Sequence, residues 1–270
     1  KIVPLILDFI EDLTNWYVKF NRNRLRGRYH TKDEQEIALS TLKKIMIIFA
    51  QVMAPFAPFI SETIYGKLSK GSVHLCNFPE ISTLDTKNIQ YQMEILQTVS
   101  KIVRNIRAKY PTITLHKIPL KNILISTNCT ETINGLKLLE TYLKTEINTM
   151  NVQYSTDNNM TKYVIQPNSK EIGQKFGKSS SLIKSKLMEL SQDDIEKFMS
   201  GVSLNIGEFV LDSTCVSVNK ILVPSDIPNQ VRLMEDNLIV TVDITQDDEV
   251  MDYYSMRLFV TNVQKLRKNS

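Results

Sequence analysis

The sequence predicts a multidomain protein, in which an all-α helical bundle over residues 1–117 precedes an α+β domain over residues 118–270. In the first part, apolar residues recur at intervals of three and four, which is the period of a helix with one buried side. After residue 118, short β-branched runs of alternating polarity stand between helical stretches and predict strands. A chain of 270 residues has room for two domains of ordinary size.

The bundle is expected to contain four helices, at residues 3–25, 32–53, 58–68 and 89–109. Gly27 follows the first helix and ends it, and Pro55 ends the second. Pro58 stands at the start of the third helix, where the missing N–H of proline costs nothing. The apolar residues of the fourth helix predict its buried side: Leu96, Val99, Ile102, Val103 and Ile106.

The second domain is expected to open with a strand at residues 120–126 and a helix at residues 131–147. Strands at residues 152–155 and 162–166 are predicted to pair around the turn-forming Asp157–Asn159. The later elements are helices at residues 178–189 and 192–200, strands at residues 209–218, 230–233 and 237–244, and a last helix at residues 247–268. Such a mixture of helices and short strands is typical of an α+β domain.

The composition excludes several classes of protein. With 42% hydrophobic and 23% charged residues, the chain can form a packed core. Its longest apolar run, Ile45–Ala50, is far shorter than the roughly 20 residues that a membrane-spanning helix needs. The three cysteines lie far apart without the spacing of a zinc site, and scattered thiols favour a reducing compartment, here the cytoplasm. Because the chain begins at Lys1 without Met, we expect a piece of a longer protein.

The positive charge of the chain lies in its first part. Residues 1–118 contain 17 Lys and Arg against 10 Asp and Glu, a net charge of +7, within an overall net charge of +4. The remaining residues contain 16 against 19, a net charge of −3. This asymmetry predicts a polyanionic partner for the first part, and a solvated basic face is the alternative.

A basic segment lies at the end of the first predicted helix, where residues Asn15–Gly27 read NWYVKFNRNRLRG. Five cations occur within ten residues: Lys19, Arg22, Arg24, Arg26 and Arg28. The helix dipole alone favours such cations by about 0.3–1 kcal/mol each, so helix capping is one explanation. Guanidinium groups also fork onto phosphates and stack on bases, and Asn21 and Asn23 offer donors and acceptors to base edges.

Two further segments carry recognisable patterns. Met53–Phe59, MAPFAPF, is a turn with two prolines, and its two phenylalanines are expected to pack beneath it. Arg104 and Arg107 lie three residues apart on one face of the fourth helix. Direct contact with RNA and exposure to solvent are both compatible with that spacing.

These three segments resemble the anticodon-binding domain of the class I isoleucyl-, valyl- and leucyl-tRNA synthetases. NWYVKFNRNRLRG is similar to the start of that domain, and MAPFAPF is similar to its Met-Ala-Pro-Phe-x-Pro-Phe turn. Arg104 and Arg107 resemble an Arg-x-x-Arg pair that closes the bundle. Two positions depart from the pattern, since Lys19 replaces a common Arg and Asn23 interrupts the arginine run. Both departures weaken bidentate phosphate contacts at those positions.

The second part resembles the isoleucyl enzymes of the eukaryotic cytosolic type. Residues 118–125, IPLKNILI, are similar to the start of their C-terminal junction region, and Asn262–Lys268, NVQKLRK, is similar to its end. Met256–Arg257 stands at the Ala-Arg of an Ala-Arg-Glu pattern, where only Arg257 is identical, Leu258 replaces the Glu and Tyr254 replaces a Gly. The heptad coiled coil common in valyl enzymes is not found. The equivalent region of a valyl or leucyl enzyme remains an alternative.

The resemblance implies a fragment that binds the anticodon stem-loop of tRNA-Ile and has no catalytic residue, metal site or cofactor of its own. The implied RNA-binding residues are Lys19, Asn21, Arg22, Asn23, Arg24, Arg26, Arg28, Arg104 and Arg107. ATP, Mg²⁺ and the attachment of isoleucine would belong to upstream domains of the same polypeptide. Lys175–Ser180, KFGKSS, resembles the Lys-Met-Ser-Lys-Ser loop of such domains only superficially, because it follows the bundle instead of preceding it.

Two functions of other classes stay open. The α+β domain, with its net charge of −3, is compatible with a protein-interaction or structural docking module. A self-contained enzyme is the third possibility, and turnover of ATP and isoleucine by this chain would support it.

Overall fold

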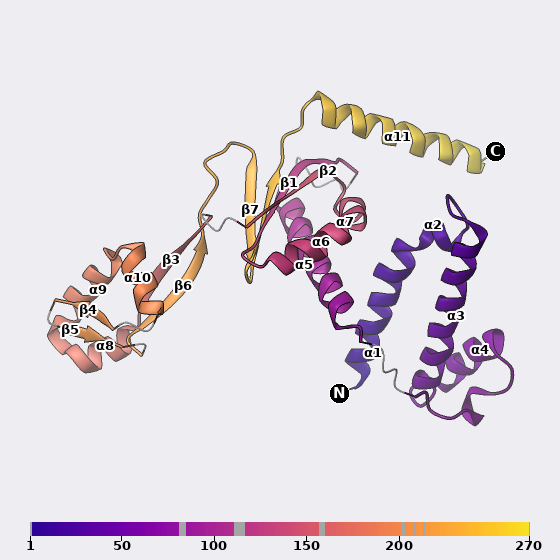
Figure 1. Cartoon of the computed structure of the whole chain (residues 1–270), viewed down its shortest axis with the longest axis horizontal. Helices are drawn as coiled ribbons and strands as arrows, with labels where there is room; N and C mark the ends of the chain where they lie inside the picture. The colour runs from indigo at the N-terminus through magenta and orange to yellow at the C-terminus, as the bar shows by residue number, and fades with distance from the viewer. Residues whose placement is uncertain are drawn as a thin grey trace. The chain divides into compact units, whose positions relative to one another are not determined.

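The computed structural model describes residues 2–80, 85–110, 117–156, 160–200, 203–207, 209–212 and 214–269 (Figure 1). Packing divides the chain into two units, Lys1–Asp85 and Thr86–Ser270. The described part of the first unit is helical, and the second unit mixes helices with small sheets. This order agrees with the expected succession of an all-α part and an α+β part.

The first unit is a series of helices joined by short turns. Its elements are α1 (Ile2–Glu11), the π-helical segment η1 (Asp12–Val18), α2 (Arg22–Leu25), α3 (Lys32–Met53), α4 (Pro58–Leu68) and the short 3-10 helix η2 (Val73–Leu75). α3 and α4 have the bounds expected from the sequence. The expected single helix over residues 3–25 is interrupted at Asn21, which lies in a turn between η1 and α2.

A capping box explains why α3 begins at Lys32. Thr31 Oγ1 accepts a hydrogen bond from the Glu34 backbone N–H at 3.3 Å, and the Glu34 carboxylate accepts one from the Thr31 N–H at 2.9 Å. These bonds satisfy N–H groups that have no partner inside the helix. Hydrogen bonds from the backbone and side chain of Thr31 hold the pKa of Glu34 below its usual range.

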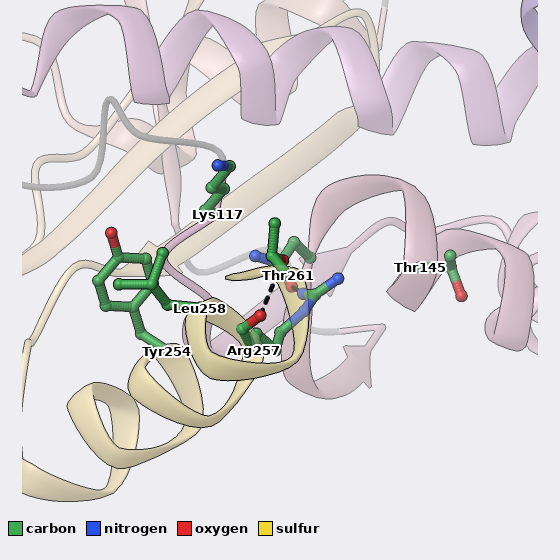
Figure 2. A pocket seen from close by; sticks show the side chains of 7 residues that line it. Lys117, Thr145, Tyr254, Arg257, Leu258 and Thr261 are labelled. Carbon is green, nitrogen blue, oxygen red and sulfur yellow. Dashed lines mark hydrogen bonds between the residues drawn. The ribbon is translucent and has the colours of Figure 1, made fainter. Parts of the chain in front are cut away.

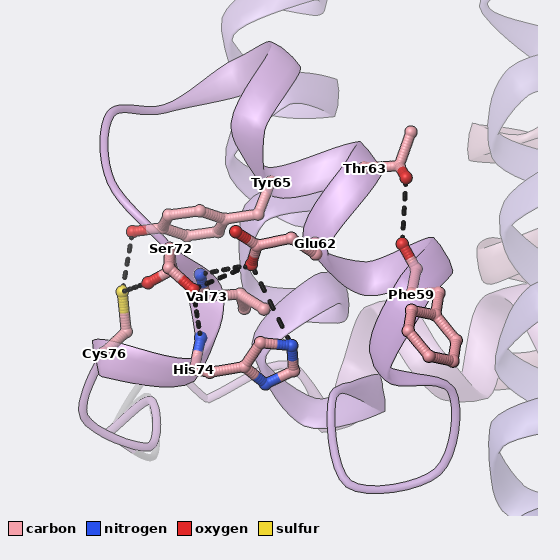
Figure 3. A network of polar contacts seen from close by, with 8 residues as sticks. All are labelled: Phe59, Glu62, Thr63, Tyr65, Ser72, Val73, His74 and Cys76. Carbon is pink, nitrogen blue, oxygen red and sulfur yellow. Dashed lines mark hydrogen bonds and ion pairs between the residues drawn. The ribbon is translucent and has the colours of Figure 1, made fainter.

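A small core and a polar network join α4 to the loop that follows it. Tyr65 and Val73 are buried in this core. The Glu62 carboxylate accepts hydrogen bonds from Ser72 Oγ at 3.0 Å and from the Val73 N–H at 2.9 Å (Figure 3). Cys76 Sγ donates to the Tyr65 hydroxyl at 3.0 Å. Glu62 and Tyr65 thus hold the loop in place, which is a structural role.

Backbone hydrogen bonds close the turn between α3 and α4, since the N–H groups of Phe56 and Ala57 both donate to the Met53 carbonyl at 2.9 Å. The expectation that two phenylalanines pack beneath this turn is wrong. Phe56 is 49% exposed and Phe59 is 89% exposed. Phe59 lies near the start of α4, on the side of the helix away from the buried Tyr65.

The second unit is built on a four-stranded mixed sheet of order β2-β1-β8-β7. Its strands are β1 (Leu120–Ser126), β2 (Thr149–Ser155), β7 (Gln230–Glu235) and β8 (Leu238–Asp243). β1 is parallel to β2, whereas β8 is antiparallel to both β1 and β7. A parallel pair needs a crossover connection, which α6 (Thr130–Leu138) and α7 (Glu140–Ile147) supply.

α5 (Lys87–Lys109) contacts this sheet and its crossover, through β7, β8, α6 and α7. Its buried residues include all five of the expected apolar side, from Leu96 to Ile106. By packing, α5 therefore belongs to the second unit, which begins at Thr86. Hydrophobic periodicity identifies the buried side of a helix but not the element that covers it.

A small lobe with its own core extends from the β3–β6 ribbon (Figure 1). Its elements are β3 (Thr161–Pro167), α8 (Ser169–Phe176), the 3-10 turn η4 (Gly177–Ser179), α9 (Ser180–Met188), α10 (Gln192–Met199), β4 (Leu204–Ile206), β5 (Phe209–Leu211) and β6 (Val216–Leu222). The expected pairing of β2 with β3 is wrong, because β2 pairs with β1 and β3 pairs with β6. The proposed turn residues, 157–159, lie outside the described residues. α8 and β4 had no counterpart in the sequence-based prediction.

The last helix, α11 (Asp248–Asn269), is anchored at its first turn. The Asp247 carboxylate accepts a hydrogen bond from the Val250 N–H at 3.1 Å and forms an ion pair with Lys121 of β1. The hydrogen bond from Lys121 lowers the pKa of Asp247, and the same contact raises the pKa of Lys121. Within the described part of the chain, no helix has the length and apolar character needed to cross a membrane.

Candidate nucleic-acid interface

The basic segment begins where the first helix changes its geometry. η1 is a π-helical segment of seven residues, and α2 is a separate helical turn of four residues. At the break between them, the Asn21 side-chain amide donates to the Tyr17 carbonyl at 2.9 Å. Asparagine side chains compete in this way with the regular helical bonds. The break places the arginines after Asn21 on a short turn of their own.

Two side-chain hydrogen bonds hold this turn against α3, and a third holds η1. Arg24 Nε donates to the Glu34 carbonyl at 3.0 Å, and Gln35 Nε2 donates to the Leu25 carbonyl at 3.2 Å. The Tyr17 hydroxyl donates to the Ala38 carbonyl at 3.4 Å. The basic segment is therefore braced before any ligand arrives, which reduces the entropy that binding must remove.

Gly27 closes the braced turn, with a φ of +63° that favours glycine. A Cβ atom there would lie 2.7 Å from Gln35 Oε1. We expect Gly27→Ala to lower the free energy of unfolding of the first unit by about 1–2 kcal/mol, measured by urea denaturation. Gly66→Ala in α4 is the matched control, since a Cβ there meets no atom within 4 Å. It should be neutral or stabilise by up to about 1 kcal/mol, and equal destabilisation by both changes would contradict this role for Gly27.

The structure separates the seven predicted residues of the segment into two groups. Asn21 and Arg24 are half-buried and bonded to backbone carbonyls, so they shape the turn. The exposed members are Lys19, Arg22, Asn23, Arg26 and Arg28. Within the described residues, the side chains of Arg22, Arg26 and Arg28 make no hydrogen bond or ion pair. These three guanidinium groups are available to an external anion.

The acidic residues near the segment do not cancel its charge. Residues 19–36 contain six cations and three acids. One of the acids, Glu34, is held by the capping hydrogen bonds of Thr31, and its carboxylate lies 3.5 Å from His30 Nδ1. The surface at this end of the first unit is therefore positive, as contact with a polyanion requires.

Arg104 and Arg107 lie on α5, in the second unit. Arg107 is only 4% exposed and donates to the carbonyls of Ile118, Ile147 and Asn148 at 3.0, 3.1 and 3.3 Å. These hydrogen bonds give Arg107 a structural role in the second unit, where its buried guanidinium is held by backbone carbonyls. Arg104 is more exposed, but Nη2 lies 2.5 Å from the buried Glu146 carboxylate.

One exposed aromatic residue of the segment was missed by the sequence reasoning. Tyr29 is 93% exposed and has a φ of +63°, in the left-handed region. An aromatic ring next to a run of arginines is typical of surfaces on which unpaired bases stack. In the sequence, the position of Tyr29 directly after Arg28 could have indicated such a role. Its exposure is visible only in the structure.

Comparison with known proteins finds a family match in the first part of the chain. Residues 1–117 match the family described as the anticodon-binding domain of tRNA ligase. The matched residues include α5, although by packing α5 joins the second unit.

The whole chain is similar to isoleucine–tRNA ligases. It is 31% identical to the cytoplasmic enzyme of Arabidopsis thaliana over 284 residues, which cover 100% of this chain and 23% of the relative. The cytoplasmic enzyme of Schizosaccharomyces pombe is 28% identical, covering 100% of this chain and 26% of the relative. The enzyme of Tetrahymena thermophila is 30% identical with the same two coverages. These similarities confirm the expected kinship with isoleucyl enzymes, and the chain spans about a quarter of the length of these relatives.

Proposed function

We propose that this chain binds the anticodon stem-loop of tRNA-Ile as part of an isoleucine–tRNA ligase. The observation that carries the proposal is the braced turn after η1, which presents three arginines without partners among the described residues. Planar guanidinium groups match the geometry of phosphate oxygens and bind them through paired hydrogen bonds. The family match of residues 1–117 supports the choice of the anticodon stem-loop as the ligand.

Some exposed residues of the segment contact phosphates, and others contact bases. Arg22, Arg26 and Arg28 contact phosphates and fix the register of the RNA. Asn23, which is exposed, offers its amide to a base edge. Tyr29 supplies a ring on which an unpaired loop base stacks. This division follows the general rule that phosphate contacts position a nucleic acid and base contacts specify it.

The remaining activity of the ligase lies in parts of the polypeptide beyond this chain. The relatives are about four times longer, and their names describe the attachment of isoleucine to tRNA. In the proposed parent enzyme, ATP and Mg²⁺ serve that reaction in a separate catalytic domain, in the cytoplasm. The segment described above contributes tRNA positioning only.

Binding of labelled tRNA-Ile to this chain, measured across a salt series, tests the proposal. Each phosphate contact releases counterions, so the three arginine contacts of the basic segment contribute about −2.5 to the slope of log K against log salt. This contribution alone should lower the affinity about 30-fold between about 50 mM and 200 mM salt. An anticodon stem-loop hairpin should compete with tRNA more strongly than an acceptor-stem hairpin of equal length. A salt-independent affinity, or no binding at the lowest salt, would contradict the proposal.

The alternative function, in which the second unit docks onto a protein surface, is supported by one observation. α11 carries an exposed apolar stripe at helical spacing, formed by Met256, Phe259, Val263 and Leu266. Because the relatives are about four times longer, the rest of the ligase polypeptide is the proposed occupant of this stripe. Amide hydrogen exchange at residues 256–266 should be slower in the full-length ligase than in this chain. Equal exchange rates would count against docking.

A further inference from the structure

A pocket of about 220 Å³ lies between the end of α7 and α11, within the second unit (Figure 2). α11 contributes Arg257, Leu258 and Thr261, together with Tyr254, and the other described lining residues are Lys117, Thr145 and Asn148. Arg257 belongs to the segment that resembles the Ala-Arg-Glu pattern, to which the proposed function assigns no role. The pocket is therefore a separate feature from the basic segment of the first unit.

Arg257 is positioned by two contacts. Its guanidinium donates to Asn148 Oδ1 and lies 5.9 Å from the centre of the Tyr253 ring. Asn148 is itself buried, and it ends α7 in the left-handed conformation that asparagine tolerates. The ion pair between Lys121 and Asp247 anchors the start of α11 to β1. The guanidinium is thus fixed at the wall of the pocket while Arg257 as a whole remains exposed.

The charges around the pocket favour an anion. Of the described residues that line it, two are cations and none is a carboxylate. The nearby Glu146 carboxylate is paired with Arg104. The last carbonyls of α7, which carry the negative end of its dipole, accept hydrogen bonds from Arg107. Two local sources of negative charge are therefore neutralised, while Lys117 and Arg257 line the cavity.

The size and the donors of the pocket point to a single phosphate group. Drug-sized ligands occupy pockets of about 300–1,000 Å³, which is more than this cavity offers. The Thr145 and Thr261 hydroxyls already donate to the carbonyls of Thr141 and Arg257, both at 2.8 Å. Their hydrogens are not directed at a ligand, so the charged donors Lys117 and Arg257 remain. Phosphate oxygens suit such donors well.

We propose that the α7–α11 pocket binds a backbone phosphate of RNA, as a contact separate from the basic segment of the first unit. A linear polyanion is favoured over a free anion because the positive charge continues along the helix. Lys265 lies one helical turn beyond Thr261, on the same side of α11, and is exposed. The second unit would then contact the same RNA as the first unit, although its net charge is close to neutral.

The test compares charge-removing pairs in the full 270-residue chain, with labelled tRNA-Ile as the probe. Lys117→Gln with Arg257→Gln should make the salt slope shallower by about one, because the pocket holds one phosphate. Lys170→Gln with Lys178→Gln, two exposed lysines of the lobe, is the control pair and should change the slope much less. Arg257→Lys keeps the charge and should keep the slope. Thr261→Glu places a carboxylate in the pocket and should weaken binding more than Ser255→Glu on another face of α11.

The outcomes separate this proposal from the proposed function. If the two glutamine pairs change the salt slope equally, the pocket proposal is overturned. In that case, a shallower slope for variants of Arg22, Arg26 and Arg28 still supports the first-unit site. If the pocket pair makes the slope shallower but the arginine variants do not, the pocket is supported and the first-unit site is overturned. Inorganic phosphate that raises the melting temperature of the wild type but not of the pocket variant, with unchanged tRNA binding, would assign a free anion and overturn RNA. Circular dichroism melts establish that each variant is folded.

Discussion

Arg107→Ala is expected to lower the free energy of unfolding of the second unit by about 3 kcal/mol. The side chain is 4% exposed and satisfies the carbonyls of Ile118, Ile147 and Asn148. Burial lowers the pKa of Arg107 to about 10, so the group stays charged at neutral pH. Its removal leaves buried acceptors without donors, at about 1–3 kcal/mol for each that water cannot reach. Urea denaturation followed by circular dichroism measures the loss.

Two variants make this prediction specific. Lys109→Ala removes an exposed cation from the last turn of the same helix and should change stability by less than about 0.5 kcal/mol. Arg107→Lys keeps the charge but loses the planar fork that reaches three carbonyls, and should restore only part of the stability. Near-wild-type stability of Arg107→Ala would mean that the three hydrogen bonds contribute little. It would also reopen a role for Arg107 outside the core.

The second large effect concerns RNA affinity. Replacing Arg22, Arg26 and Arg28 together with glutamine should weaken tRNA-Ile binding about 100-fold at low salt, which corresponds to about 2.7 kcal/mol. The salt slope should become shallower by about two to three, because each lost phosphate contact removes roughly 0.7–0.9. Arg24 stays unchanged in this variant, since its hydrogen bond to the Glu34 carbonyl braces the turn. Fluorescence anisotropy across a salt series measures both quantities.

A matched variant controls for net charge. Lys43→Gln, Lys44→Gln and Lys67→Gln remove three exposed cations from the same unit and alter the total charge equally. We expect this control to reduce affinity less than about fivefold, because scattered surface charges act only through a screened field. The melting temperature of the arginine variant should equal that of the wild type, since those guanidinium groups make no hydrogen bond or ion pair among the described residues. Equal losses of affinity in both variants would indicate a diffuse electrostatic effect and not a site.

Local signals in the sequence were enough for several features. Pro55 after α3 and Pro58 at the start of α4 act within a few residues, and these bounds of the two helices followed from such signals. The similarity to anticodon-binding domains rests on contiguous segments and was likewise accessible without coordinates. The crowding of cations at residues 19–28 is also a property of the sequence alone.

The partners of each element were decided only by the tertiary structure. α5 has an unmistakable buried side, yet the sheet and crossover of the second unit cover it. β2 and β3 are adjacent in sequence, but each pairs with a strand from elsewhere in the chain. Arg22 and Arg107 look alike as basic residues on helices, and one is exposed while the other is buried among carbonyls. Periodicity and capping depend on neighbours along the chain, whereas burial and strand pairing depend on contacts between distant residues, which no local pattern encodes.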